Sequence, residues 1–395
     1  MSRALYLVDG ARTPFGTYMG ELRHLSAADL AIAATREALS RARVAPDAFD
    51  AVVLGNVMQA ERESYYLAKY VGLQVGMAET ITGLTVNRLC GSGMQAVVSA
   101  CQAMRLEESE LALVGGTECM SRAPFILRGA REGLRGDQTL EDPLLGPHSV
   151  FVDPACGLIM GETAEVLGDE YGISREAMDT FALRSQEAAR QAIERGRLAR
   201  EIVPVEIPGK GGPKLVSRDE HPRETSLEKL ATLKPAFRKG GHVTPGNASG
   251  INDGACSLVL ATEERVAALN LTPKARVVSW SVAGVSGRRM GIGPAPAIQV
   301  ALQRAGLTLA DMSVIEVNEA FAAQYLAVEK ELGLDRDKVN PNGGAIALGH
   351  PIGASGARIL LSLMYELEER QARYGVASAC IGGGQGIAMV LERVS

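Results

Sequence analysis

The sequence lacks several features that mark specialised classes of protein. Its six cysteines include no C-x-x-C pair and are too few for a secreted disulfide framework, so we expect reduced thiols. The 41 basic and 46 acidic residues form no long block of one sign, which argues against a nucleic-acid partner. No apolar run approaches the roughly 20 residues needed to cross a bilayer, so no membrane association is predicted.

Signals for targeting and for bound cofactors are missing as well. The opening MSRALYLVDG has neither an apolar signal region nor an Arg- and Ser-rich leader, and the final ERVS is not a peroxisomal address. We therefore expect a soluble, cytoplasmic protein. No His, Cys, Asp or Glu cluster has the spacing of a metal site, and the isolated GGGQG fails the dinucleotide pattern, so neither a metal nor a prosthetic group is predicted.

The chain does contain a regular alternation of apolar and amphipathic segments. Short apolar runs at 4–8, 51–57 and 111–116 alternate with helical patterns at 26–42 and 93–106. This alternation is typical of βαβ units around a mostly parallel, buried sheet, and so of an α/β protein. A length of 395 residues exceeds what one hydrophobic core usually serves, which favours two domains or a duplicated architecture.

The C-terminal part repeats this order of elements. Strands are predicted at 276–284, 314–320 and 374–384, with helices at 295–306 and 354–370. NRLCGSGMQAVVSA in the first half corresponds to GHPIGASGARILLS in the second, which indicates an internal duplication. The predicted domains are an N-terminal half (1–119 plus 250–272), a loop domain that covers the ligand site (120–249) and a C-terminal half (273–395).

Two residues lie in glycine-flanked turns at the entry to helices. Cys90 follows a strand-like segment and would meet unpaired N–H groups and the positive end of a helix dipole, which favour a thiolate nucleophile. His350 occupies the equivalent turn of the second half, where a base could reach Cys90. The alternatives are a small core cysteine and a hydrogen-bonded structural histidine.

Cys380 and Asn318 come at the ends of predicted strands, 30 residues after and 32 residues before His350. Such spacing suits successive βα units that deliver their turns to one crevice. The alternatives are a buried core thiol for Cys380 and a helix N-cap for Asn318.

Five motifs together resemble the thiolase family: NRLCGSG, GNASGINDGA, VNEAFA, GGAIALGHPIGASG and CIGGGQG. The resemblance covers the whole chain. It implies a duplicated five-layer αβαβα core with an inserted loop domain, coenzyme A thioesters as substrates, and a homodimer or homotetramer. The implied reaction is acyl transfer between acyl-CoA and acetyl-CoA through an acyl-cysteine, by reversible Claisen condensation or thiolysis of a 3-ketoacyl-CoA.

The resemblance also implies a role for each matching residue. Cys90 would be the nucleophile, His350 its base, and Cys380 the acid or base at the acetyl carbon. Asn318 would hold a water that stabilises an enolate with His350, and the backbone N–H groups of Cys90 and Gly382 would form a second oxyanion site. The glycines around His350 are expected to leave space for pantetheine and the thioester.

Further positions are implied to contact coenzyme A or the acyl group, although the apolar ones could equally be core and the arginine a surface charge. They are Arg223, Phe237, Ala248, Ser249, Met160, Met290 and Phe321. Ile159 stands where many acetyl-specific relatives have histidine, which weakens a prediction of acetyl specificity, and Pro341 also departs from the family pattern. The competing hypotheses are a non-catalytic acyl-CoA carrier on the same fold and a thiol hydrolase that uses Cys, His and Asn.

Overall fold

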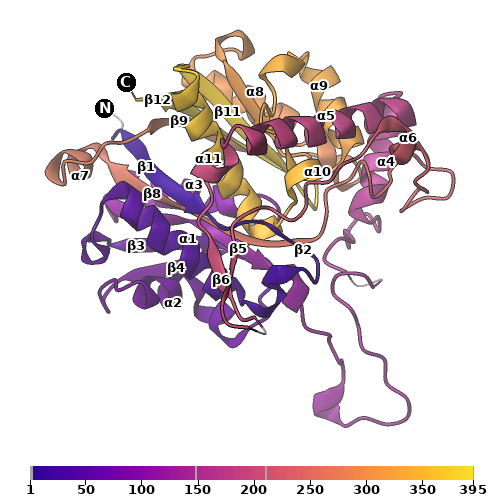
Figure 1. The fold of residues 1–395 in the computed structure, drawn as a ribbon, viewed down its shortest axis with the longest axis horizontal. Helices are drawn as coiled ribbons and strands as arrows, with labels where there is room; N and C mark the ends of the chain where they lie inside the picture. Colours follow the sequence, from indigo (N-terminus) through magenta and orange to yellow (C-terminus); the bar gives the residue numbers. More distant parts are fainter. Residues whose placement is uncertain (1–2, 147–148, 210, 395) are drawn as a thin grey trace.

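The computed structural model describes residues 3–146, 149–209 and 211–394 (Figure 1). The strands are β1 (Leu5–Arg12), β2 (Gly16–Thr17), β3 (Ala51–Gly55), β4 (Thr82–Val86), β5 (Leu111–Cys119), β6 (Val205–Ile207), β7 (Lys214–Val216), β8 (Asn252–Thr262), β9 (Ala275–Gly284), β10 (Val314–Val317), β11 (Tyr374–Ile381) and β12 (Gln385–Arg393). The α-helices are α1 (Ala27–Ala42), α2 (Leu67–Gln74), α3 (Ser92–Arg105), α4 (Met160–Glu170), α5 (Arg175–Glu194), α6 (Leu227–Ala231), α7 (Glu263–Ala268), α8 (Pro294–Ala305), α9 (Ala322–Leu332), α10 (Ala345–Leu348) and α11 (Ile352–Glu369).

Ten strands of the described residues join in one sheet, in the order β10-β11-β12-β9-β1-β8-β5-β3-β4, with β2 paired to β8. In the N-terminal half β3 is parallel to β4 and β5, and β8 is antiparallel to β5 and β1. The C-terminal half repeats this pattern, because β10 is parallel to β11 and β12 is antiparallel to β11 and β9. The predicted duplication is therefore confirmed by the strand pairing. The halves meet where Tyr6 and Leu7 pair with Arg276 and Ala275.

Helices cover both faces of the sheet. Val53 of β3 belongs to a hydrophobic cluster with α3 and α11, whereas its neighbour Val52 packs with α1 and α2 on the opposite face. Ile298 of α8 and Val328 of α9 pack on the outer face of the C-terminal half. Because helices cover both faces, strands such as β5 and β8 are buried along their whole length, as their apolar runs predict.

The central layer consists of α3 and α11, which pack closely through glycines. A Cβ on Gly93 would lie 2.6 Å from the backbone nitrogen of Ala357, and one on Gly356 would collide with the backbone of Met94. No larger residue fits between two backbones at this separation. The contact brings together the two helices whose entry turns carry Cys90 and His350.

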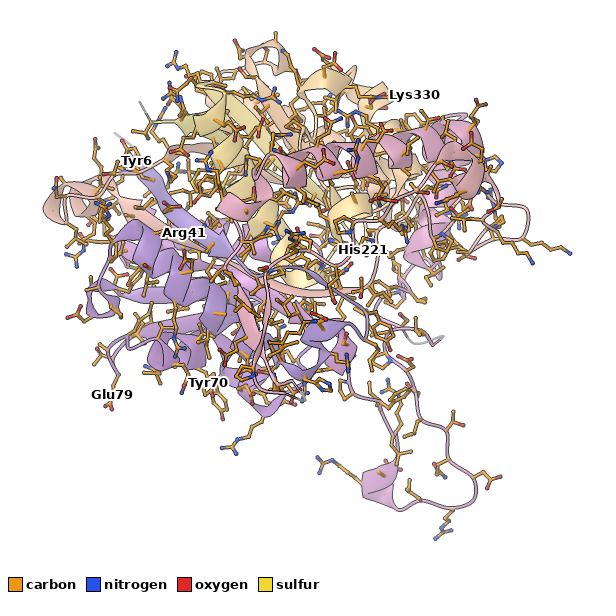
Figure 2. The ribbon with its side chains drawn as sticks, viewed as in Figure 1. Tyr6, Arg41, Tyr70, Glu79, His221 and Lys330 are labelled. Atoms are coloured by element: carbon orange, nitrogen blue, oxygen red, sulfur yellow. The ribbon has the colours of Figure 1, made fainter. Side chains whose placement is uncertain are left out.

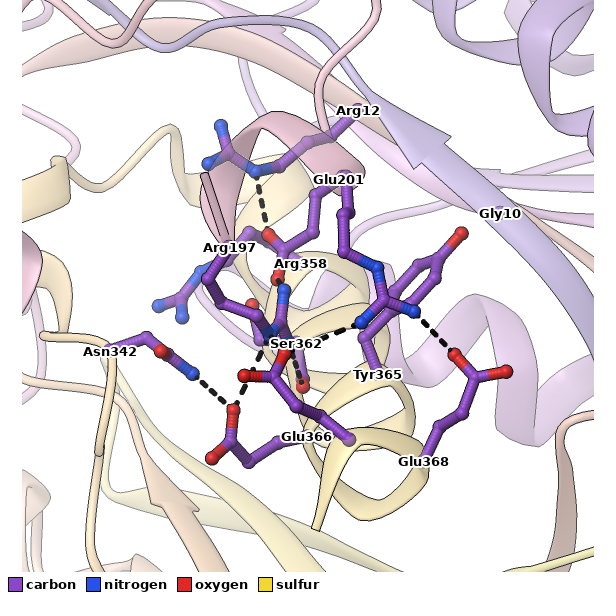
Figure 3. A network of polar contacts seen from close by, with 12 residues as sticks. Gly10, Arg12, Arg197, Glu201, Asn342, Arg358, Ser362, Tyr365, Glu366 and Glu368 are labelled. Carbon is purple, nitrogen blue, oxygen red and sulfur yellow. Dashed lines mark hydrogen bonds and ion pairs between the residues drawn. The ribbon is translucent and has the colours of Figure 1, made fainter. Parts of the chain in front are cut away.

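The region between the halves holds α4, α5, α6 and the antiparallel hairpin β6–β7. Buried ion pairs fasten it to the sheet (Figure 3). The Nε of Arg12 on β1 lies 3.0 Å from Glu201, and its Nη1 lies 2.7 Å from Asp219. Arg197 binds the second oxygen of Glu201 at 2.8 Å. Arg12 and Glu201 each bind two partners of opposite charge, so the network compensates these buried charges and fixes this region on the core. The domain boundaries at residues 119, 249 and 272 stay predictions.

Candidate active site

Cys90 occupies a strained turn between β4 and α3. Leu89 has a φ of +46°, a left-handed conformation that is uncommon for residues other than glycine. Ser92 holds the turn, because its Oγ accepts a hydrogen bond from the N–H of Arg88 at 2.8 Å and donates one to the carbonyl of Leu89 at 2.7 Å. As a result Cys90 lies partly exposed, immediately before the first turn of α3.

The surroundings of the Cys90 sulfur act on its pKa in opposite directions. Burial removes the sulfur from water and raises the pKa to about 11, whereas backbone N–H groups of Gly382 and of Cys90 itself donate to the sulfur and lower it. The charge of Glu118 raises it further. Of the two N–H donors, only the N–H of Cys90 belongs to the helix entry, because the N–H groups of Gly91 and Ser92 bond to carbonyls of the turn. Desolvation outweighs both donors. Cys90 is therefore a neutral thiol at pH 7, not the thiolate that the helix N-terminus alone suggests.

The glycines around His350 serve packing and do not open the cavity, contrary to our expectation. Gly349 has a φ of +98°, and any Cβ there would meet the side chain of Asn252. The Oδ1 of Asn252 accepts a hydrogen bond from the backbone N–H of His350 at 2.9 Å. A Cβ on Gly353 would lie 2.8 Å from the carboxylate of Glu118. These glycines bring the backbone of the turn against the core, and none lines the cavity described below.

Hydrogen bonds define the tautomer of His350. Ser355, on the first turn of α11, donates its hydroxyl proton to the carbonyl of Pro351 at 2.9 Å. Its Oγ also lies 2.6 Å from the Nδ1 of His350 and, with its own hydrogen used on Pro351, accepts a hydrogen bond from the Nδ1–H. The Nε2 is left as the acceptor, and the Nδ2 of Asn318 lies 3.5 Å from it.

His350 is 5% exposed, and burial lowers its pKa to about 3, with a smaller effect from the charge of Arg358. The imidazole is thus neutral at pH 7, with a free electron pair on Nε2. Cys90 and His350 line the same cavity, and a neutral imidazole and a neutral thiol are the kinds of group that serve as base and nucleophile.

Cys380 and Gly382 come at the end of β11, directly against the Cys90 turn. A Cβ on Gly91 would lie 2.5 Å from the side chain of Ile381, so the two segments are in contact. Cys380 is 1% exposed, and burial followed by the nearby Cys90 sulfur raises its pKa above the usual thiol range. Gly382 faces Met160, whose sulfur would lie 3.3 Å from a Cβ at this position.

Asn318 follows β10 and is fully buried. It is not an N-cap, since α9 begins four residues later with Phe321 at its N-cap. Its Oδ1 has no hydrogen-bond partner among the described residues. A buried amide oxygen without a partner suits a water or a ligand group.

Three of the four predicted chemical side chains, Cys90, His350 and Cys380, line one cavity of about 300 Å³. Its walls are otherwise mainly apolar. They are formed by Leu144, Leu145, Phe151, Ile159, Met160, Gly161, Phe237, Ser249, Gly250, Ile251, Met290, Ala320, Phe321 and Ile352. The fold thus brings Phe237, Ser249, Met160, Met290 and Phe321 to the same space, as the sequence predicts.

Two predicted coenzyme A contacts lie outside this cavity. Ala248 is buried and forms a bridge with the backbone of Phe321. Arg223 lines a separate surface groove beside α5, and its Nη2 donates to the carbonyl of Pro245 at 2.7 Å. Two residues before it, His221 (labelled in Figure 2) lies close to the backbone of Ile346 in α10, and its partial burial lowers its pKa to about 4.

Glu118 is a buried residue of the site that sequence reasoning missed. Its carboxylate accepts backbone N–H bonds from Val57 at 3.1 Å, Met58 at 2.9 Å and Gly353 at 3.1 Å. Burial raises its pKa to about 7 despite these donors. It ties the turn after β3 to the helix that follows His350. A charged residue near the end of an otherwise apolar strand was the available signal.

Both halves of the chain match domains of one family. Residues 5–264 match the thiolase N-terminal domain, and residues 271–393 match the thiolase C-terminal domain. The chain belongs to the thiolase family. The mitochondrial 3-ketoacyl-CoA thiolase of Bos taurus is 48% identical over 396 residues, which cover 100% of this chain and 99% of that one. Acetyl-CoA acetyltransferase of Escherichia coli K12 is also 48% identical, over 98% of this thiolase and 99% of the relative.

The fold of this thiolase agrees with solved structures. The crystal structure of human mitochondrial 3-ketoacyl-CoA thiolase has a TM-score of 0.97 to it at 48% identity and covers 99% of both chains. The predicted five-layer α/β core and acyltransferase activity on coenzyme A thioesters are thereby confirmed.

The prediction of a cytoplasmic location is wrong on these comparisons, because the bovine, human and mouse relatives are named as mitochondrial proteins. It rested on missing signals alone, and a missing signal carries no positive information about the compartment. Among the described residues, no helix of this thiolase has the length and apolar character that a membrane span requires.

Proposed function

We propose that this site cleaves 3-ketoacyl-CoA with coenzyme A, and catalyses the reverse condensation, through an acyl group on Cys90. The observation that carries the proposal is the neutral His350, whose Nδ1 is hydrogen-bonded to Ser355 and whose Nε2 carries no proton, on the same cavity as two thiols. A base, a nucleophile and a second proton donor are what this reaction needs.

In thiolysis, Nε2 of His350 takes the proton of Cys90 while the sulfur forms a bond to the 3-keto carbon. The bond between C2 and C3 then breaks, and the acetyl-CoA enolate takes a proton from Cys380. In the second half, the Cys380 thiolate takes the thiol proton of incoming coenzyme A, whose sulfur attacks the acyl group. Cys90 leaves and recovers its proton from His350. One 3-ketoacyl-CoA and one coenzyme A thus give acetyl-CoA and a shortened acyl-CoA.

Two sets of donors are proposed for the two carbonyl oxygens. The N–H groups of Gly382 and Cys90, which already point at the sulfur, would bind the oxygen of the group attached to Cys90. Asn318, close to His350, would hold a water against the enolate oxygen. Phe237 and Ser249 would accompany the pantetheine arm, with Ala248 supporting Ser249 and Arg223 near the adenine.

We also propose a homodimer or homotetramer. β4 is an edge strand of the sheet and leads directly to Cys90, and Leu84 on it is 50% exposed. A long segment around Ala130–Glu132 reaches away from the body (Figure 1) and carries exposed apolar side chains, including Phe125 and Leu140. Exposed apolar surface of this kind favours association between copies.

The proposed thiolysis is tested by identifying the products of the reaction. With acetoacetyl-CoA and coenzyme A, we expect two molecules of acetyl-CoA for each substrate consumed, measured by chromatography. A thiol hydrolase would instead release a free acid without consuming coenzyme A. An acyl-CoA carrier would bind the substrate without turnover. Either result would remove the thiolysis assignment.

The tautomer of His350 gives a further prediction. Ser355→Ala should lower kcat/KM for thiolysis by about 10- to 100-fold, because Nδ1 loses its acceptor and the ring its fixed orientation. Alkylation of Cys90 by iodoacetamide should slow near pH 7, where His350 assists ionisation, and stay unchanged near pH 11, where the thiol ionises unaided. The measurement is the alkylation rate against pH.

Ser362→Ala is the matched control, since Ser362 is buried on the same helix, two turns further on. It should leave the alkylation profile unchanged. If Ser355→Ala keeps the profile of the unmodified protein, Ser355 has no part in positioning His350.

A further inference from the structure

One wall of the cavity comes from the region between the two halves of the fold. Leu144 and Leu145 lie there, and Leu144 belongs to the same hydrophobic cluster as Ile352 of α11, which also lines the cavity. Among the described residues that line the cavity, none is Lys, Arg, Asp or Glu. A charged acyl group would lose its hydration there without a partner, so this wall suits an uncharged aliphatic chain.

Hydrogen bonds hold the backbone of Leu144 in place. Its N–H donates to Oδ1 of Asp142 at 2.8 Å, and its carbonyl accepts a hydrogen bond from the buried hydroxyl of Ser149 at 2.6 Å. The N–H of Val150 donates to the carbonyl of Pro143 at 2.8 Å. These bonds fix the backbone on both sides of Leu144, so its side chain has a defined position.

The side chain of Leu144 packs beside the nucleophile. It is 3% exposed and forms a hydrophobic cluster with Val57, Met120 and Ile352, against which Cys90 also packs. Leu145, the next residue, is 66% exposed although it also lines the cavity, so it lies at the rim. Phe151 and Ile251, which also line the cavity, pack against the same cluster.

We propose that Leu144 sets the upper length of the acyl chain that Cys90 accepts, because its buried side chain forms the part of the cavity wall that packs beside Cys90. The inference rests on the proposed thiolysis. A buried apolar side chain in the wall of a small cavity limits chain length because extra methylenes find no space behind it. Its size therefore determines which chains react, and the chemistry at Cys90 is unaffected.

The experiment compares kcat/KM for thiolysis of straight-chain 3-ketoacyl-CoA from C4 to C16 in the unmodified protein, Leu144→Ala and Leu144→Phe. Leu144→Ala removes three carbons and should raise the ratio of C12 to C4 activity at least about tenfold. Leu144→Phe should lower the same ratio by a similar factor. A loss of stability would not change the ratio of C12 to C4 activity in opposite directions for a smaller and a larger side chain. If the alanine variant does not fold, the ratio in the phenylalanine variant tests the proposal alone.

Leu215→Ala is the control, because Leu215 on β7 also lies in the region between the two halves, is 61% exposed and does not line the cavity. It should leave the ratio within twofold. C4 thiolysis with unchanged C12 to C4 ratios in both Leu144 variants would overturn this inference and leave the proposed function standing. Absence of C4 thiolysis in the unmodified protein would overturn both.

Discussion

Replacing Cys90 by alanine should lower kcat for thiolysis of acetoacetyl-CoA by at least about four orders of magnitude, because removal of a nucleophile that acts with a base stops the covalent route. The measurements are the steady-state rate and the mass of the protein after incubation with acetyl-CoA. The unmodified protein should gain the mass of one acetyl group, and Cys90→Ala should gain none.

Cys156→Ala provides a matched control, since Cys156 is also a partly exposed thiol but lies outside the cavity. It should keep both the rate and the acetyl adduct. Cys90→Ala should also keep the melting temperature of the unmodified protein within a few degrees, because a partly exposed thiol contributes little packing. An active Cys90→Ala protein would remove Cys90 as the nucleophile and, with it, the proposed mechanism.

The sequence predicts a reactive residue best where that residue lies at the end of a helix or strand. The glycines and the duplicated pattern place Cys90 and His350 at helix entries, and an apolar run places Cys380 at the end of a strand. In an α/β fold those ends gather at one crevice, so the convergence of these three residues could be predicted.

Contacts between distant segments could not be predicted in this way. Glu118 meets Gly353, and Asn252 meets His350, across separations of 235 and 98 residues that no local pattern encodes. The same limit explains the error about the glycines around His350. A glycine that admits a ligand and a glycine that admits a neighbouring backbone look alike in sequence, and only the packed structure separates them.

The protonation of the site was also beyond local reasoning. A helix N-terminus favours a thiolate, but desolvation depends on everything that covers the sulfur, and here it raises the pKa of Cys90 to about 11. With the pKa of His350 lowered to about 3, both groups stay neutral at pH 7. In the proposed mechanism the proton therefore passes from Cys90 to His350 as the sulfur attacks an electrophile, and neither group is ionised beforehand.

Cys380→Ser should separate the two halves of the reaction. Serine keeps a proton at this position, but its hydroxyl is a far weaker acid than a thiol and a far weaker acid catalyst for the enolate. We expect thiolysis and condensation to fall by about 10²- to 10⁴-fold, the usual contribution of a general acid or base. Transfer of an acetyl group from acetyl-CoA to Cys90 requires no proton at the acetyl carbon. The coenzyme A thiolate is a good leaving group even without the proton that Cys380 would give it, so the adduct should still form, although more slowly.

Cys256→Ser is the control for Cys380→Ser. It tests whether replacing a buried thiol on a strand by a hydroxyl is enough to cause the loss of condensation. Cys256 lies on β8 and is fully buried, as Cys380 is nearly so on β11, but it does not line the cavity. Both variants should lose similar stability, since each buries a hydroxyl in an apolar layer, whereas only Cys380→Ser should lose condensation. Exchange of the methyl protons of acetyl-CoA with deuterated water, followed by NMR, reports the step directly and should vanish in Cys380→Ser alone. Undiminished exchange in that variant would assign the proton transfer to another group, with His350 as the remaining base on the cavity.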